Sequence, residues 1–149
     1  MTTTVFQRIV VATDFSDSSE AAWALAQRMG EALQSDVVLV HVFVPPLVYG
    51  EPAVALGGAD VYESAERWVE ETLSRWAGSA RAQGVPVRTV VRTGTAHEEI
   101  VAVATEERAD VIVMGTHGRA GLARVLIGSV AERVLRFAPC PVLTVRTPE

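Results

Sequence analysis

Short apolar runs alternate along this chain with longer segments in which apolar residues recur every three or four positions. The runs are four to eight residues long, and the longest, over residues 37–44, is apolar almost throughout. Such a run indicates a strand buried on both faces, as in a parallel sheet. Strands are predicted over residues 9–12, 37–44, 87–92, 111–114 and 142–145.

The segments between these runs carry helical periodicity and helix-capping signals. Residues 16–20 supply N-cap candidates for the first helix, with Asp17 and Glu20 at the spacing of a capping box. A second capping box, from Thr95 to Glu98, opens the third helix, and the last helix is predicted over residues 129–137. The apolar stripe of the first helix is Ala22, Leu25, Ala26, Met29 and Leu33, and that of the second is Ala65, Trp68, Val69, Thr72, Leu73, Trp76 and Ala80.

Five strands alternating with four helices predict an α/β fold, a three-layer sandwich built on a parallel sheet. The chain has 149 residues, of which 49% are apolar and 21% charged, so a packed core is expected. The sequence contains no internal repeat, and residues 1–149 are expected to form one domain.

One connection, residues 44–58, breaks the alternation because it is long and rich in proline and glycine. A connection of this length can be a lid, a partner surface or a mobile segment. The composition favours a mobile segment over a functional lid.

Net charge is −5, which disfavours nucleic-acid binding, because that binding depends on clustered Lys and Arg. Residues 111–131 nevertheless contain no acidic residue and include His117, Arg119 and Arg124, which suits a small anion. No apolar run is long enough to span a bilayer, and residues 1–8 lack the apolar core of a signal peptide. With a single cysteine, the expected location is the cytoplasm, without a membrane partner.

Glycine-rich turns follow the fourth predicted strand. Ligands of open α/β sheets bind beyond the carboxyl ends of the strands. Residues 13–16, after the first strand, contain no glycine, so the Rossmann dinucleotide fingerprint and a Walker lysine loop are both missing. Gly115 and Gly118 form a turn after the fourth strand, and Gly128 precedes the last helix, whose N-terminal amides attract anions. The glycines alone could serve only tight turns, but two such turns around an acid-free stretch favour phosphate binding.

The spacing Gly115-x-x-Gly118, nine residues, then Gly128-Ser129 resembles the ATP-binding signature of the universal stress protein family. Residues 9–16, 39–42, 111–118 and 140–145 are similar to further segments of that family, so the resemblance covers nearly the whole chain. It implies one universal stress protein domain with a Rossmann-like fold of the adenine nucleotide alpha hydrolase type. The implied strand order is 3-2-1-4-5, with the nucleotide at the switch between the first and fourth strands.

The resemblance also implies roles for individual residues. Asp14 would bond the ribose hydroxyls, and the backbone around Val42 would meet the adenine edge. Mg²⁺ would accompany ATP, held by the phosphates and water. Some family members have proline at the position of Ala12 and a hydroxyl residue at the position of Ala131. Because alanine has no hydroxyl, this chain lacks one possible phosphate contact at Ala131. The implied ATP-binding residues are Ala12, Thr13, Asp14, Val42, Met114, Gly115, Gly118, Arg119, Gly128, Ser129 and Val130.

The function expected from the resemblance is that of a nucleotide-responsive stress or signalling module acting as a homodimer. The dimer would pair through the last strand, which is otherwise an exposed apolar edge, at Val142, Leu143, Thr144 and Val145. The alternative is a slow ATP hydrolase or a phosphoryl- or adenylyl-transfer enzyme on the same site. It is disfavoured because the sequence shows no Walker lysine, clustered carboxylates or nucleophile–base pair, so no catalytic residue and no metal ligand is expected.

A third class, the receiver-like phosphorylation switch, needs an aspartate where Thr93 and Gly94 stand, and it is discounted. Among the remaining residues, His41 is expected to be a hydrogen-bonded core residue. His117 could contact phosphate or be exposed to solvent, and the sequence favours neither. Trp23 falls off its helix's apolar stripe and is expected at a partly covered surface.

Overall fold

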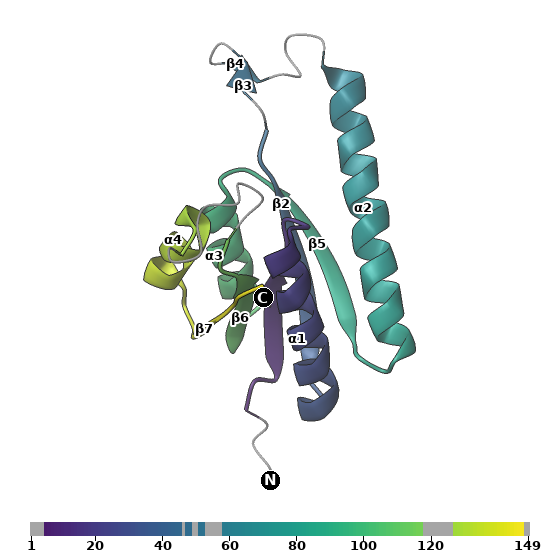
Figure 1. The fold of residues 1–149 in the computed structure, drawn as a ribbon, viewed down its shortest axis with the longest axis vertical. Coiled ribbons are helices and arrows are strands. Elements are labelled where there is room, and N and C mark those ends of the chain that lie inside the picture. The colour runs from purple at the N-terminus through teal and green to yellow at the C-terminus, as the bar shows by residue number, and fades with distance from the viewer. Residues whose placement is uncertain (1–4, 46, 49–50, 53–57, 118–126, 148–149) are drawn as a thin grey trace.

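In a computed structural model of the chain, the structure describes residues 5–45, 47–48, 51–52, 58–117 and 127–147 (Figure 1). The main sheet consists of β1 (Arg8–Ala12), β2 (Asp36–Phe43), β5 (Val87–Thr93), β6 (Val111–Gly115) and β7 (Val142–Val145). The helices are α1 (Asp17–Leu33), α2 (Ala59–Ala82), α3 (Ala96–Glu106) and α4 (Ser129–Phe137). A separate short pair of strands is β3 (Leu47–Val48) and β4 (Glu51–Pro52).

The five main strands form one parallel sheet in the order β5-β2-β1-β6-β7. Counting only these five strands, the order is 3-2-1-4-5, and the predicted fold class is confirmed. The chain moves from β1 to β2 on one side and later returns to β6 on the other. The carboxyl ends of β1 and β6 therefore flank the switch point at which ligands of such sheets bind.

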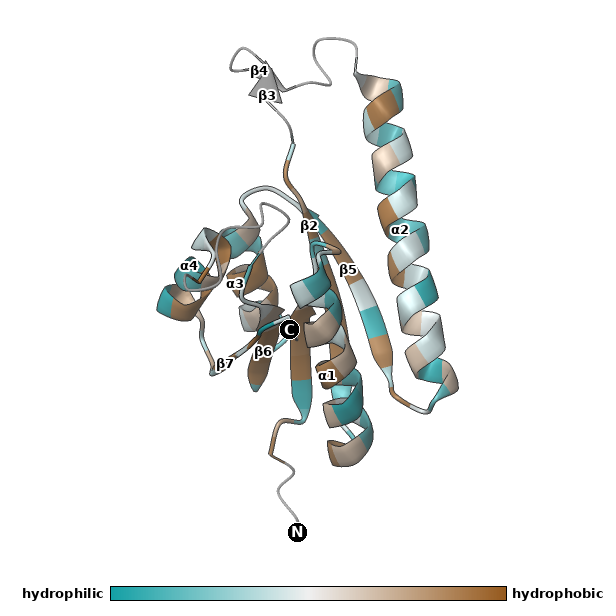
Figure 2. Ribbon diagram, viewed as in Figure 1, coloured by the Kyte–Doolittle hydropathy of each residue, from teal (hydrophilic) through white to brown (hydrophobic). Residues whose placement is uncertain are grey.

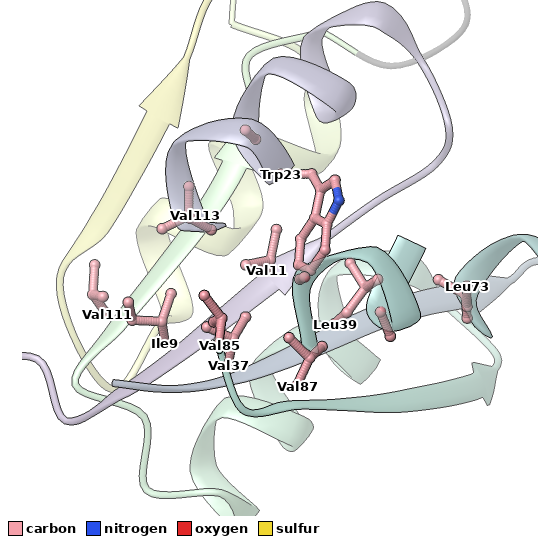
Figure 3. Packing of buried hydrophobic residues seen from close by; sticks show 14 of the residues in the cluster. Ile9, Val11, Trp23, Val37, Leu39, Leu73, Val85, Val87, Val111 and Val113 are labelled. Atoms are coloured by element: carbon pink, nitrogen blue, oxygen red, sulfur yellow. The ribbon is translucent and has the colours of Figure 1, made fainter. Parts of the chain in front are cut away.

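Helices cover both faces of the sheet, with α1 and α2 on one face and α3 and α4 on the other (Figure 1). Strand alternation sends Ile9 and Val11 into the core under α1 and α2, and Val10 and Ala12 into the core under α3 and α4. Figure 3 shows the first of these cores, where Trp23 lies over Val11. β6 and most of β1 are hydrophobic, while β5 and α2 alternate hydrophobic and hydrophilic residues (Figure 2). Across the described residues, none of the helices combines the length and apolar character that a bilayer crossing requires.

The starts of α1 and α3 both fall at predicted N-cap positions, but the predicted capping boxes do not form. Ser16, not Asp17, is the N-cap of α1, and its side chain accepts a hydrogen bond from the Ser19 amide. Thr95 is the N-cap of α3, but its side chain makes no capping hydrogen bond, so the predicted capping box is wrong. The bounds predicted for α4 and β7 are confirmed.

Two of the tryptophans also lie differently from the prediction. Trp23 is buried, with 6% of its surface exposed, and it stacks on Trp76 of α2 with ring centroids 6.2 Å apart. Trp68, expected in the core, is 48% exposed. Trp23 is buried because α1 packs against α2 as well as against the sheet, so the buried face of α1 is wider than its apolar stripe in the sequence.

The connection between β2 and α2 contains the antiparallel pair β3–β4, where the sequence predicted no strand. Leu47 pairs with Pro52 and Val48 with Glu51. The other residues from 46 to 57 lie outside the described residues, so the expected mobility of this connection stays a prediction.

Candidate functional site at the carboxyl edge of the sheet

A cavity of about 270 Å³ lies at the carboxyl ends of β1, β2 and β6, beside the start of α4. It contains nine of the residues predicted to bind ATP. These nine are Ala12, Thr13, Asp14, Val42, Met114, Gly115, Gly128, Ser129 and Val130. The other two predicted residues, Gly118 and Arg119, lie outside the described residues. The cavity is also lined by His117 and Ala131, which were already candidate neighbours of the phosphates from the sequence, and by residues that the sequence did not single out, namely Ser19, Val40, Ala96, Ile100 and Thr116.

One end of the cavity is apolar. Val40 comes from β2 and Met114 from β6, the strands on either side of β1, while Ile100 comes from α3 and Ala131 from α4. All four belong to the core under α3 and α4, so the cavity opens directly onto packed hydrophobic side chains. The small side chains of Ala12 and Ala131 leave room there for a flat apolar group. The sequence carried a signal for this lining, because Ile100 and Ala104 lie four positions apart, the spacing of one face of a helix.

The backbone of β2 continues past the end of β1. The β1–β2 register ends at the pair Ala12 and Val40. Directly after it, the Thr13 amide donates to the Val40 carbonyl at 2.9 Å. Peptide groups two residues apart in a strand point the same way. The N–H and C=O of Val42 therefore point beyond the end of β1, toward the cavity that Val42 lines.

The turn between β1 and α1 is held by short-range side-chain hydrogen bonds. Asp14 Oδ1 accepts a hydrogen bond from the Ser16 amide at 3.0 Å, and the Ser16 hydroxyl also donates to it. Thr13 Oγ1 accepts from the Phe15 amide at 3.0 Å. These bonds fix the direction of the Asp14 side chain, the only carboxylate among the described residues that line the cavity.

His41 supports the same turn from β2. Its Nδ1 lies 2.9 Å from the Thr13 carbonyl oxygen. Because a carbonyl only accepts, Nδ1 must carry the proton in this contact. The hydrogen bond predicted for His41 is confirmed, but the residue is half-buried rather than part of the core.

On the other side of the cavity, hydrogen bonds connect the residues after β6 to β7, α1 and the start of α4. The Thr116 amide donates to the Val145 carbonyl at 3.0 Å, and the Gly128 amide donates to the Thr116 carbonyl at 2.7 Å. The His117 carbonyl accepts from the Ser18 hydroxyl of α1. His117 Nδ1 bonds the Thr116 hydroxyl at 2.9 Å, and its Nε2 is buried without a hydrogen-bond partner within the described structure. His117 is thus half-buried at the cavity rather than fully exposed.

The start of α4 leaves amides available to a ligand. Gly128 is the N-cap of this helix, and within the described part of the chain no side chain caps it. The first N–H groups of a helix have no partner inside the helix. By contrast, α1 begins at the same edge of the sheet with its N-terminus capped by Ser16. An anion in this cavity is therefore best placed at α4, where the helix dipole also favours negative charge.

Gly115 lines the cavity but has a separate structural reason to be glycine. A Cβ atom there would lie 2.3 Å from Ser18 Oγ and 2.8 Å from the Ser18 carbonyl carbon. The end of β6 is therefore pressed against the start of α1, and only a residue without a side chain fits. Sequence reasoning assigned this glycine to the ligand alone, and the contact with α1 was not predicted.

Cys140 and the acidic residues do not form a reactive centre in the described structure. Burial of the Cys140 thiol raises its pKa, and the nearby Asp110 carboxylate raises it further, so the thiol stays protonated at neutral pH. Among the described residues, no group of three or more His, Cys, Asp or Glu side chains is arranged to hold a metal ion.

Comparison with known proteins agrees with this geometry. The family model described as the universal stress protein family matches residues 6–146. A universal stress protein of Methanocaldococcus jannaschii is 38% identical over 146 residues, covering 97% of this chain and 85% of that protein. The solved structure of a second universal stress protein of this archaeon superposes with a TM-score of 0.84 at 27% identity, covering 97% and 99% of the two chains.

Two further solved structures contain nucleotides. A universal stress protein in complex with cAMP has a TM-score of 0.68 and 28% identity, over 97% of this chain and 99% of that one. The universal stress protein from Archaeoglobus fulgidus in complex with dAMP has a TM-score of 0.65 and 25% identity, over 95% and 98% of the chains. With the family model matching nearly its whole length, the chain belongs to the universal stress protein family.

Proposed function

We propose that this protein binds ATP in the cavity at the carboxyl edge of its sheet and acts as a nucleotide-responsive stress or signalling module in the cytoplasm. The observation that carries the proposal is the start of α4. No side chain in the described structure caps its amides. The start of the helix lines the cavity whose other end is apolar and can accommodate a base. Relatives of 25–28% identity were solved with the adenine nucleotides cAMP and dAMP, which supports this class of ligand.

In this proposal the adenine occupies the apolar end of the cavity. Val40, Ile100 and Met114 provide its walls, and the backbone N–H and C=O of Val42 meet its polar edge. A donor and an acceptor side by side match the N1 and N6 positions of adenine. The Asp14 carboxylate, at the cavity mouth, accepts hydrogen bonds from the ribose hydroxyls.

The phosphates lie at the start of α4, against the amides of Ser129 and Val130, because the Gly128 amide already donates to the Thr116 carbonyl. Gly118 and Arg119 complete this part of the proposed site. Mg²⁺ is held by the phosphates and water, because the described residues offer no cluster of carboxylates for it.

Calorimetry of the purified protein with ATP and Mg²⁺ tests the proposal. Saturable binding is expected, and Asp14→Ala is expected to weaken it by about tenfold or more, since a charge-assisted hydrogen bond contributes about 1.5–3 kcal/mol. Asp60→Ala, at an exposed carboxylate in the first turn of α2, is the matched control and should bind like the unchanged protein. A folded protein that takes up no ATP would refute the proposal. Phosphate release followed over many turnovers separates a binding module from an ATP hydrolase.

We also propose that the protein forms a homodimer through β7. This strand lies at one end of the sheet and pairs only with β6 in the described structure, and its Leu143 is 39% exposed. Pairing with β7 of a second copy covers this edge at Val142, Leu143, Thr144 and Val145.

Sedimentation velocity at micromolar concentration checks the dimer. Leu143→Lys is expected to shift the protein to monomers. The lysine of one copy would face the lysine of the other across the two-fold axis, and the two positive charges would repel each other. Val91→Lys is the matched control, since Val91 has the same 39% exposure but lies on β5, at the opposite end of the sheet. A dimer that survives Leu143→Lys unchanged would rule out this interface.

A further inference from the structure

Phe15 follows Asp14 directly and has an unusual backbone conformation for a bulky residue. Its φ angle is +63°, in the left-handed region that favours glycine and asparagine. A phenylalanine stays in this region only where its surroundings hold it there. The structure must therefore contain contacts that keep Phe15, and with it the turn carrying Asp14, in place.

Those contacts are made by an aromatic cluster, defined here as Phe15, His41, Trp68 and Trp76. The Phe15 ring meets Trp68 edge-on, with centroids 4.9 Å apart at 74°, and Trp76 edge-on, at 5.5 Å and 75°. It also meets the His41 ring at 4.9 Å. Edge-to-face contacts of this kind are favourable beyond the area they bury.

The cluster holds the turn on both sides of Asp14. Before it in the chain, the Thr13 carbonyl accepts the hydrogen bond from His41 Nδ1 at 2.9 Å. After it, the Phe15 ring packs against the tryptophans of α2. The Asp14 carboxylate is then oriented by its bond from the Ser16 amide.

We propose that Phe15 is a positioning residue for nucleotide binding, and that α2 contributes to affinity through Trp68 and Trp76. This inference rests on the proposed function, because it concerns the affinity of the site for ATP. None of the described residues of α2 lines the cavity. The helix therefore acts on the ligand only through Phe15 and the turn that presents Asp14.

The test compares Phe15→Ala with Phe6→Ala. Phe6 is a close internal control because it is also phenylalanine, also has a φ angle of +63°, and is also half-buried against the same core. It lies before β1, at the opposite edge of the sheet from the cavity. Both variants lose a ring and keep an unfavourable backbone angle, so their losses of stability should be similar, but only one lies beside Asp14.

Two measurements are made on each folded variant. Calorimetry with ATP should show an affinity at least tenfold weaker for Phe15→Ala and unchanged for Phe6→Ala, with Phe15→Tyr restoring most of the loss. The double variant Asp14→Ala/Phe15→Ala should bind no more weakly than Asp14→Ala alone, because the ring acts through that carboxylate. Hydrogen exchange without ligand should show a faster Ser16 amide in Phe15→Ala only.

Trp68→Ala keeps the experiment decisive if Phe15→Ala does not fold. Trp68 is 48% exposed, so its loss leaves the core intact, and it should weaken ATP binding severalfold and speed exchange of the Ser16 amide. An unchanged Ser16 exchange rate in these variants, or affinity losses for Asp14 and Phe15 that simply add, would overturn the inference. If the unchanged protein bound no ATP, the proposed function would fail instead, and the exchange rates would still decide whether the aromatic cluster holds the turn.

Discussion

Replacing Gly128 with valine is expected to abolish measurable ATP binding while leaving the protein folded. Gly128 lines the cavity and is the N-cap of α4, where the proposed phosphates meet the helix amides. A branched side chain there competes for the space of the phosphates and separates them from the amides. The expected loss is more than 100-fold, equivalent to about 2.8 kcal/mol of binding free energy.

The fold should tolerate this change, because the backbone angles of Gly128, φ −61° and ψ 156°, are open to every residue type. Calorimetry gives the affinity, and thermal unfolding gives the stability of the same sample. Gly128→Ser is an informative companion, since serine is a preferred N-cap that should firm the helix start yet compete with the phosphates for its amides. ATP binding to Gly128→Val within tenfold of the unchanged protein would contradict the assignment of the phosphates to α4.

Gly115→Ala is expected to have its large effect on folding rather than on the ligand. The added Cβ would meet Ser18 at its hydroxyl and, at 2.8 Å, at its carbonyl carbon. A side chain could rotate away, but the backbone of α1 cannot move without shifting the helix. The expected loss is about 2–3 kcal/mol of unfolding free energy, in the range of overpacked cores, measured by urea denaturation.

Gly78→Ala is the control for that measurement. Gly78 is exposed within α2, and a Cβ there meets nothing within 4 Å. Because glycine is unfavourable inside a helix, this substitution should raise stability by about 0.5–1 kcal/mol. Equal stability of Gly115→Ala and the unchanged protein would show that β6 and α1 can separate at no cost.

The sequence was enough to predict the main sheet and the position of the site. Apolar runs mark the strands, and the bounds of α4 were predicted fully because Gly128 and Pro139 flank it. The described residues expected around the ligand all line one cavity, since each lies near the carboxyl end of a strand or at the start of α4. That placement depends on chain direction, which the alternation of strands and helices predicts, and on strand order, which the resemblance to the family implied.

What could not be predicted depends on contacts between elements. The burial of Trp23 arises from packing between α1 and α2, which the periodicity of one helix does not reveal. The left-handed Phe15 is held by residues from β2 and α2, more than 25 positions away in the chain, and a turn sequence alone gives no sign of it. The short pair β3–β4 involves Pro52, a residue that argues against a strand in sequence.

The close fit of Gly115 against Ser18 has a consequence for how the glycine signature should be used as a diagnostic. A chain of this fold that had lost its nucleotide would still need glycine at that position, because the requirement comes from α1. Glycine at position 115 therefore indicates the fold and carries little information about the ligand. Assigning nucleotide binders within such sequences should instead weigh the position of Gly128, whose backbone angles are open to every residue type.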